Sequence, residues 1–167
     1  MSIAPGYVQM MAAYNAEMNR RVYEAAARLP EAECRRDRGA FWRSIHGTLA
    51  HLVWGDRQWM SRFDGWPKNT VGIRDSGTDP RPLAELAAER VECDARISEW
   101  ASRVRQDWLD GTLTWWSGAA NKELTRPLAV LVPHFFNHQT HHRGQVHAMI
   151  TAAGERTGDT DLMLIAE

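Results

Sequence analysis

The segment that most constrains the fold is NHQTHHRGQVH, residues 137–147, because five of the seven histidines lie in it or just before it. As a helix, it places His138 and His142 one turn apart on the same face. Both belong to a series with spacings of three and four, which is typical of the buried face of a helix: Leu131, Phe135, His138, His142, Gln145 and Met149. A buried imidazole without a partner costs about 1–3 kcal/mol. The pattern therefore favours a ligand that uses both imidazoles.

The hydrophobic periodicity predicts four helices, at about residues 5–29, 41–63, 82–104 and 127–153. Between them, the charged residues 30–39 are predicted to be a solvated loop. Residues 66–82 are predicted to be a long loop, because Pro and Gly recur there, and residues 107–126 a short hairpin or an irregular excursion. The chain is therefore predicted to be an all-α four-helix bundle, a fold in which sites are commonly built from facing helices.

Length and composition restrict the classes of function. The 167 residues suit one domain, residues 1–167, and a net charge of -1 without a basic block argues against nucleic-acid binding. Cys34 and Cys93 form no metal-binding or disulfide spacing. No apolar stretch approaches the roughly 20 residues of a membrane span, and the start lacks the pattern of a signal peptide. We expect a cytoplasmic protein that does not bind a membrane.

A third imidazole is available on the second predicted helix. His51 lies on the flank of its apolar stripe, and Gly55, one turn later, would let another helix approach closely. Three imidazoles make a site for a divalent metal with one position open for water or substrate, as in catalytic zinc sites, and nickel, iron or cobalt also accept imidazoles. The predicted ligands are His51, His138 and His142. Gln145, one turn beyond His142, is a candidate to orient a ligand of the metal or to contact the substrate.

Other interpretations of these residues remain open. The histidine pair can also be a hydrogen-bonded pair in the core. His134, one turn before His138, is a candidate fourth ligand, a substrate contact or a packed core residue, while His46 and His147 are interpreted as structural or exposed. Arg143 is interpreted as part of an ion pair or a subunit contact. Arg90, near the buried face of the third predicted helix, is interpreted as a side chain that reaches out to solvent, with an anion site as the less favoured alternative.

Two long stretches resemble the DinB family, in the group that also includes YfiT-like proteins. They are DRGAFWRSIHGTLAHLVWGDRQWMSRF, residues 37–63, and HFFNHQTHHRGQVHAMI, residues 134–150. The resemblance implies an up-down-down-up four-helix bundle, usually a homodimer, with a metal held by the residues that correspond to His51, His138 and His142. Zinc and nickel are both associated with the family. Relatives include thiol transferases that use bacillithiol and isomerases that use mycothiol.

Three hypotheses for the function follow. The first is a metal-dependent transferase that acts on a small-molecule substrate with a low-molecular-weight thiol, which the metal presents as a thiolate. The second is a hydrolase in which the same metal activates water. The third is a non-catalytic metal-binding protein of a stress response. DNA binding is the weakest alternative.

Overall fold

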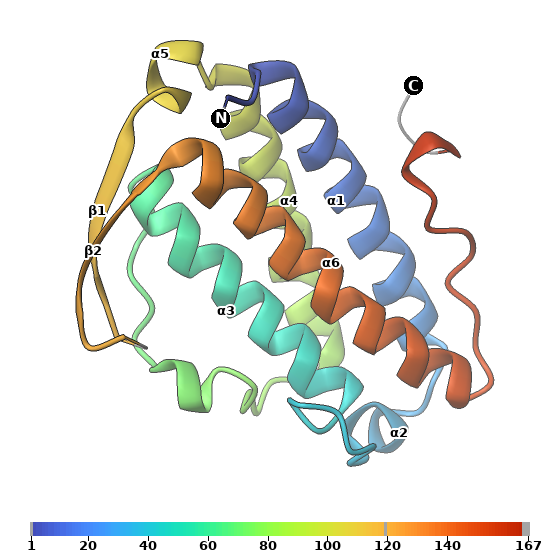
Figure 1. Ribbon diagram of the computed structural model, residues 1–167. Helices are drawn as coiled ribbons and strands as arrows, with labels where there is room; N and C mark the ends of the chain where they lie inside the picture. The colour runs from blue at the N-terminus through green and yellow to red at the C-terminus, as the bar shows by residue number, and fades with distance from the viewer. Residues whose placement is uncertain (1, 119, 165–167) are drawn as a thin grey trace.

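The computed structural model describes residues 2–118 and 120–164, which form a mostly helical protein with one small antiparallel sheet. Figure 1 shows four long helices side by side, and these are α1 (Pro5–Ala27), α3 (Ile45–Phe63), α4 (Leu83–Arg103) and α6 (Leu128–Ala152). Helix α1 packs against α4 and α6, and α3 packs against the same two helices. In Figure 1, α1 and α6 run in one direction and α3 and α4 in the other. The predicted helical class is confirmed.

Local signals explain where the long helices begin and end. Pro5 occupies the first turn of α1, and Gly154, with φ of 94°, follows the end of α6. Helix α3 begins at Ile45 and not near residue 41, because the side chain of Ser44 caps it by accepting a hydrogen bond from the Gly47 amide at 2.9 Å. The predicted start of this helix is wrong.

The predicted solvated loop at residues 30–39 is also wrong, because it contains the short helix α2 (Glu31–Arg35). Glu31 lies in its first turn and pairs with Arg35 one turn later at 2.7 Å, which suits the helix dipole. Cys34 is fully buried, and its Sγ donates to the Ala26 carbonyl at 3.3 Å. One buried residue in a charged segment is too little for periodicity to detect.

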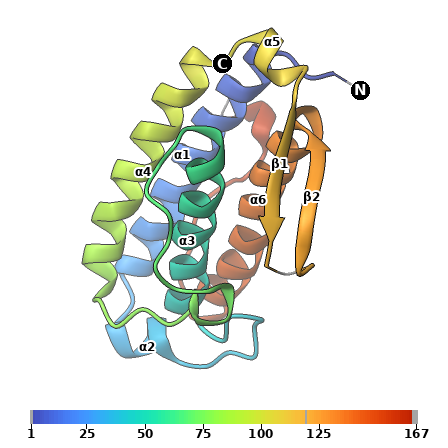
Figure 2. The ribbon, with the colours of Figure 1, turned by 90° about the vertical axis from the view of Figure 1, so that its left-hand side faces the viewer.

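The segment before α6 contains the short helix α5 (Gln106–Leu109) and a hairpin of β1 (Thr112–Ser117) and β2 (Lys122–Pro127). Of the two alternatives predicted there, the hairpin is present. Successive residues of β1 face opposite sides. Trp115 meets Trp59 of α3 edge to face at 5.8 Å between ring centroids, while Trp116 is 64% exposed. Figure 2 shows the hairpin along one side of the helices.

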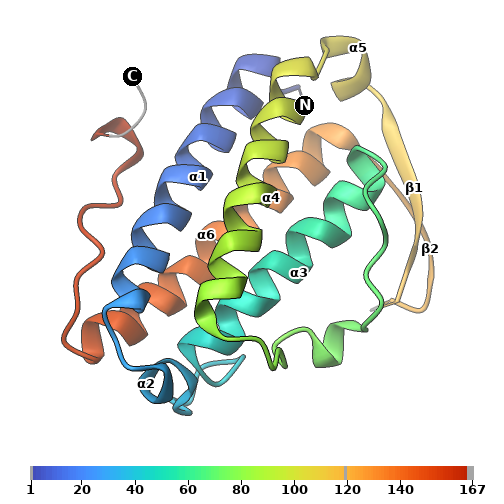
Figure 3. The same ribbon diagram turned by 180° about the vertical axis from the view of Figure 1, so that it is seen from behind.

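The long loop at residues 64–82 and the C-terminal segment both lie against the helices. The loop contains a 3-10 turn (Ile73–Asp75), and a second such turn (Leu162–Leu164) lies near the C-terminus. Figure 3 shows the C-terminal segment beside α1. The Tyr14 hydroxyl of α1 donates to the Thr160 carbonyl at 2.6 Å.

An ion-pair cluster crosses the core between α3 and α4. Arg90 is 2% exposed, and its Nη1 and Nη2 lie 2.6 Å from Asp56 Oδ2 and 2.8 Å from Asp94 Oδ1. Asn19 of α1 donates to the same Asp94 carboxylate at 2.9 Å. The interpretation of Arg90 as a residue that reaches solvent is wrong, because two buried carboxylates offset its charge inside the core.

Arg143 of α6 is buried as well, so its interpretation as part of an ion pair or a subunit contact is wrong. Its guanidinium donates to the Asn15 side chain and, at 3.3 Å, to the oxygens of Asn19 and Gln139. Gln139 in turn donates to the Asp56 carboxylate. A polar network thus connects all four long helices.

The network yields a prediction about stability. Arg90→Ala would leave the carboxylates of Asp56 and Asp94 buried without their cation, so the free energy of unfolding should fall by about 3–5 kcal/mol. Urea denaturation followed by circular dichroism measures this. The control is Arg20→Ala, which removes an exposed arginine paired with Glu17 and Glu24, and its midpoint should stay near that of the parent. Equal effects of the two substitutions would contradict the assignment.

Candidate metal centre

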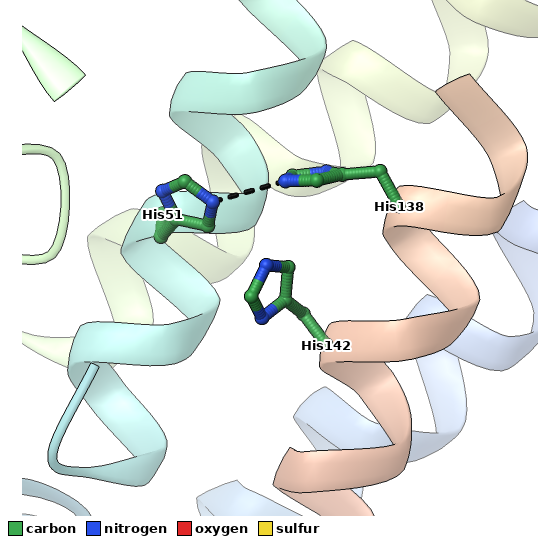
Figure 4. A group of neighbouring side chains, drawn as sticks. All are labelled: His51, His138 and His142. Atoms are coloured by element: carbon green, nitrogen blue, oxygen red, sulfur yellow. Dashed lines mark hydrogen bonds between the residues drawn. The ribbon is translucent and has the colours of Figure 1, made fainter. Parts of the chain in front are cut away.

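The structure brings together the three histidines predicted as ligands. His51 comes from α3, His138 and His142 come from α6, and their rings point toward a common centre (Figure 4). The Nε2 atoms of His51 and His138 are 3.0 Å apart. One nitrogen from each of the three residues lies within 4.8 Å of the others. This is a group of three nitrogen donors that could hold one ion.

Close packing of α3 on α6 makes this arrangement possible. Gly55 lies one turn after His51, and a Cβ added to it would stand 2.9 Å from His138 Cε1. The ring of His138 therefore occupies the space that a side chain at residue 55 would fill. The expected close approach of another helix at Gly55 is present.

Hydrogen bonds determine which nitrogen of two histidines faces the centre. The Ser76 hydroxyl donates to the Ile73 carbonyl at 2.7 Å, so it accepts from His51 Nδ1 at 2.7 Å. His142 Nδ1 donates to Gln145 Oε1 at 2.8 Å. In both rings Nε2 is left with its lone pair. Metal-binding histidines characteristically donate their other N–H in this way.

The environment keeps these imidazoles neutral. Burial lowers the pKa of His51 to about 3, with further contributions from His138 and His142. Burial and the neighbouring His142 lower the pKa of His138 to about 4, and burial also lowers the pKa of His142. The neutral form is the one that binds a metal. Neutral rings with lone pairs directed at one centre therefore fit a divalent cation.

The three histidines line a cavity of about 570 Å³ between α3, α6, the hairpin and the long loop. Trp42 stacks on His51 with 4.1 Å between ring centroids. Trp54 and Trp59 also line the cavity, whereas Trp66 lies elsewhere in the core. The other lining residues come from several segments: Phe41, Gly55, Gln58, Arg62, Val71, Gly72, Ile73, Trp115, Trp116, Ser117, Gly118 and His134. The walls are thus largely aromatic, and no Asp or Glu is among the described lining residues.

The remaining histidines lie outside the group of three donors. His134 is at the cavity wall, where its ring meets Trp59 edge to face at 5.2 Å and lies 6.3 Å from the His138 ring. This position suits a substrate contact better than a fourth ligand. His46 is buried against the Arg81 carbonyl at 2.9 Å, and Thr157 Oγ1 lies 2.6 Å from His147 Nδ1. Both have structural contacts.

Two residues at the site were not predicted from the sequence. Trp42 was assigned to the helix that was expected to begin near residue 41, and it instead lies in a turn before α3. In that turn Arg43 has φ of 66°. Ser76 lies in the long loop, where no periodicity indicates which side chain faces the helices. No sequence pattern would have identified either residue.

The similarity to known proteins covers nearly the whole chain. The model of the DinB family matches residues 4–167. The chain belongs to the DinB family. One relative is protein DinB of Bacillus subtilis (strain 168), which is 24% identical over 164 residues, covering 89% of this chain and 87% of the relative. Among the described residues of this DinB-family chain, no helix has the length and apolar character needed to cross a membrane.

The contact at Gly55 gives a prediction about metal affinity. Gly55→Ala should displace the His138 ring and weaken zinc binding about tenfold or more, while the fold is kept because the ring can swing away. Gly144→Ala is the matched control on α6, since a Cβ there meets nothing within 4 Å. By helix propensity alone, both changes would stabilise the protein by about 0.5–1 kcal/mol. Competition with a chromophoric chelator measures zinc affinity, and equal affinities of the two variants would overturn the argument.

Proposed function

We propose that this protein is a metal-dependent transferase that acts with a low-molecular-weight thiol, and that His51, His138 and His142 hold its divalent metal. The observation that carries the proposal is the group of three neutral imidazoles at the wall of an aromatic cavity. Three protein ligands leave one position open for an exogenous group. Zinc and nickel are the proposed metals.

When bound, the metal would lower the pKa of a coordinated thiol and stabilise the thiolate. The residues of the chain position the reactants. Ser76 and Gln145 hold the rings of His51 and His142, and Trp42 covers one face of His51. The aromatic walls exclude water and can bind the apolar part of an electrophile. Burial lowers the pKa of His134, which favours the neutral imidazole at the cavity wall.

The composition of the cavity supports a thiol over water as the nucleophile. Enzymes that activate water on zinc commonly use a carboxylate as general base. The described part of the cavity wall offers imidazoles, an arginine and indole rings, with no Asp or Glu. A nucleophile that binds the metal directly as an anion does not need such a base once its proton has left.

The same proposal includes the domain organisation, the helix topology, the oligomeric state and the location of the protein. We propose that the chain is a single DinB-type domain with the up-down-down-up four-helix topology. We also propose that it forms a homodimer and acts on a small molecule in the cytoplasm, without binding nucleic acid or membrane. The opposite directions of α1 and α6 relative to α3 and α4 in Figure 1 support the topology.

The first prediction of this proposal concerns metal content. The parent protein, purified without an affinity tag, should contain about one zinc or nickel per chain, and His142→Ala should lose it while remaining helical. His147→Ala is the control, because His147 contacts Thr157 outside the site. Elemental analysis beside circular dichroism measures both quantities. Full metal content in His142→Ala would exclude this residue as a ligand.

The second prediction concerns the thiol. In the cobalt-loaded protein, a small neutral thiol should produce a thiolate-to-metal charge-transfer band, because sulfur occupies the open position. The zinc-loaded protein should consume electrophiles of a test panel only when a thiol is present. Turnover without thiol would favour the hydrolase instead. Tight metal binding without a thiol band or any turnover would favour the non-catalytic metal-binding protein.

A further inference from the structure

The cavity contains one arginine, Arg62, and no carboxylate of the described residues pairs with it. Arg62 lines the cavity, and within the described part of the chain it has neither an ion pair nor a hydrogen bond. Two other arginines of α3 and α4 differ. Arg57 of α3 pairs with Glu89, and Arg103 of α4 lies 3.3 Å from Asp64. The environment of Arg62 therefore differs from that of the arginines near it.

Two indole rings hold Arg62 in this position. Its Cζ lies 4.7 Å from the centroid of Trp59 and 5.7 Å from that of Trp115. The negative faces of the two rings attract the guanidinium. The rings stabilise the cation, but they offer no oxygen to accept hydrogen bonds from its five N–H donors as a carboxylate would. Burial lowers the pKa of Arg62, which shows that its surroundings disfavour the charge. An anion placed beside it would reverse this.

Arg62 lies far along the cavity from the three histidines. The cavity-lining residues of α3 recur at helical spacing, from His51 through Gly55 and Trp59 to Arg62. Arg62 is the eleventh residue after His51, which corresponds to roughly 16 Å along the helix axis. His134 of α6 contacts Trp59 between these two positions. The cavity thus has donor nitrogens at one end, a cation at the other and aromatic walls between them.

We propose that Arg62 is an anion-binding residue of this cavity and takes the carboxylate of an elongated ligand whose other end reaches the three histidines. The proposal rests on the proposed function and names the class of its substrate. The ligand has an apolar or aromatic body of roughly 10–16 Å, as the helix rise sets the separation. The carboxylate belongs either to the thiol or to the electrophile, and the chemistry of recognition at Arg62 is the same for both.

The test uses zinc-loaded protein and isothermal titration calorimetry. The probes are ω-mercaptocarboxylates of two, six and eleven carbons, each beside its neutral carboxamide. For the longest probe, the acid should bind about tenfold more tightly than the amide, since a hydrogen bond between two charged groups is stronger than one to a neutral amide. Arg62→Gln should abolish this preference and leave the affinity for the amide within about twofold. Arg62→Lys, which keeps the charge, should retain part of it.

Arg57→Gln is the matched control. It removes the same charge from the same helix, but Arg57 is paired with Glu89 and does not line the cavity. The preference for the long acid should survive in this variant. Retention of the preference in Arg62→Gln, or an equal loss in Arg57→Gln, would overturn the proposal.

A second set of probes separates this proposal from the thiol hypothesis. Undecanoate and undecanamide carry no sulfur, so a preference for the acid that depends on Arg62 supports the anion site through the electrophile. The same preference confined to the mercapto acids supports it through the thiol. If mercaptoacetamide does not bind the zinc-loaded protein while undecanoate still depends on Arg62, the thiol hypothesis fails and the anion site remains. Absence of any dependence on Arg62 with both probe sets refutes the site.

Discussion

The close contact between α3 and α6 is the constraint on which the rest of the site depends. Because residue 55 has no side chain, the ring of His138 can lie against the backbone of α3. This contact brings Nε2 of His138 to 3.0 Å from Nε2 of His51. His142 follows from the helical repeat of α6, one turn later. The absence of a side chain at residue 55 therefore gives His138 the space in which it meets His51.

The polar network next to this contact preserves its register. Asp56 and Gln139 each directly follow a residue of the contact, and Gln139 donates to the Asp56 carboxylate. Asp56 also pairs with Arg90, so α4 is connected to the same point. A buried ion pair often stabilises a protein less than apolar side chains of equal volume would. It does, however, require one relative position of the two helices that it joins. A shift of α3 along α6 would break these interactions, which keeps the histidines aligned.

Much of the site could be predicted from the sequence, because His138 and His142 are related by local helical geometry. His51 and Gly55 are related in the same way, and periodicity identified the helix that contains them. The burial of Arg143 and Gln139 could not be predicted from the sequence. Helix α6 packs against α1 as well as α3, so it has two buried faces. The hydrophobic periodicity of a helix identifies one buried face, but it does not say how many other helices pack against it. Ser76 reaches His51 from a loop, where no repeat applies.

Arg90 and Arg62 show how the same side chain takes different roles in this fold. Arg90 lies in the core between α3 and α4, and two carboxylates offset its charge. Arg62 lies at the wall of the cavity, where Trp59 and Trp115 contact its guanidinium and no carboxylate of the described chain pairs with it. A charge in a partly buried place needs a counter-charge from somewhere. In the core, carboxylates of the chain supply the counter-charge to Arg90. In the cavity, a ligand would bring the counter-charge into the space beside Arg62.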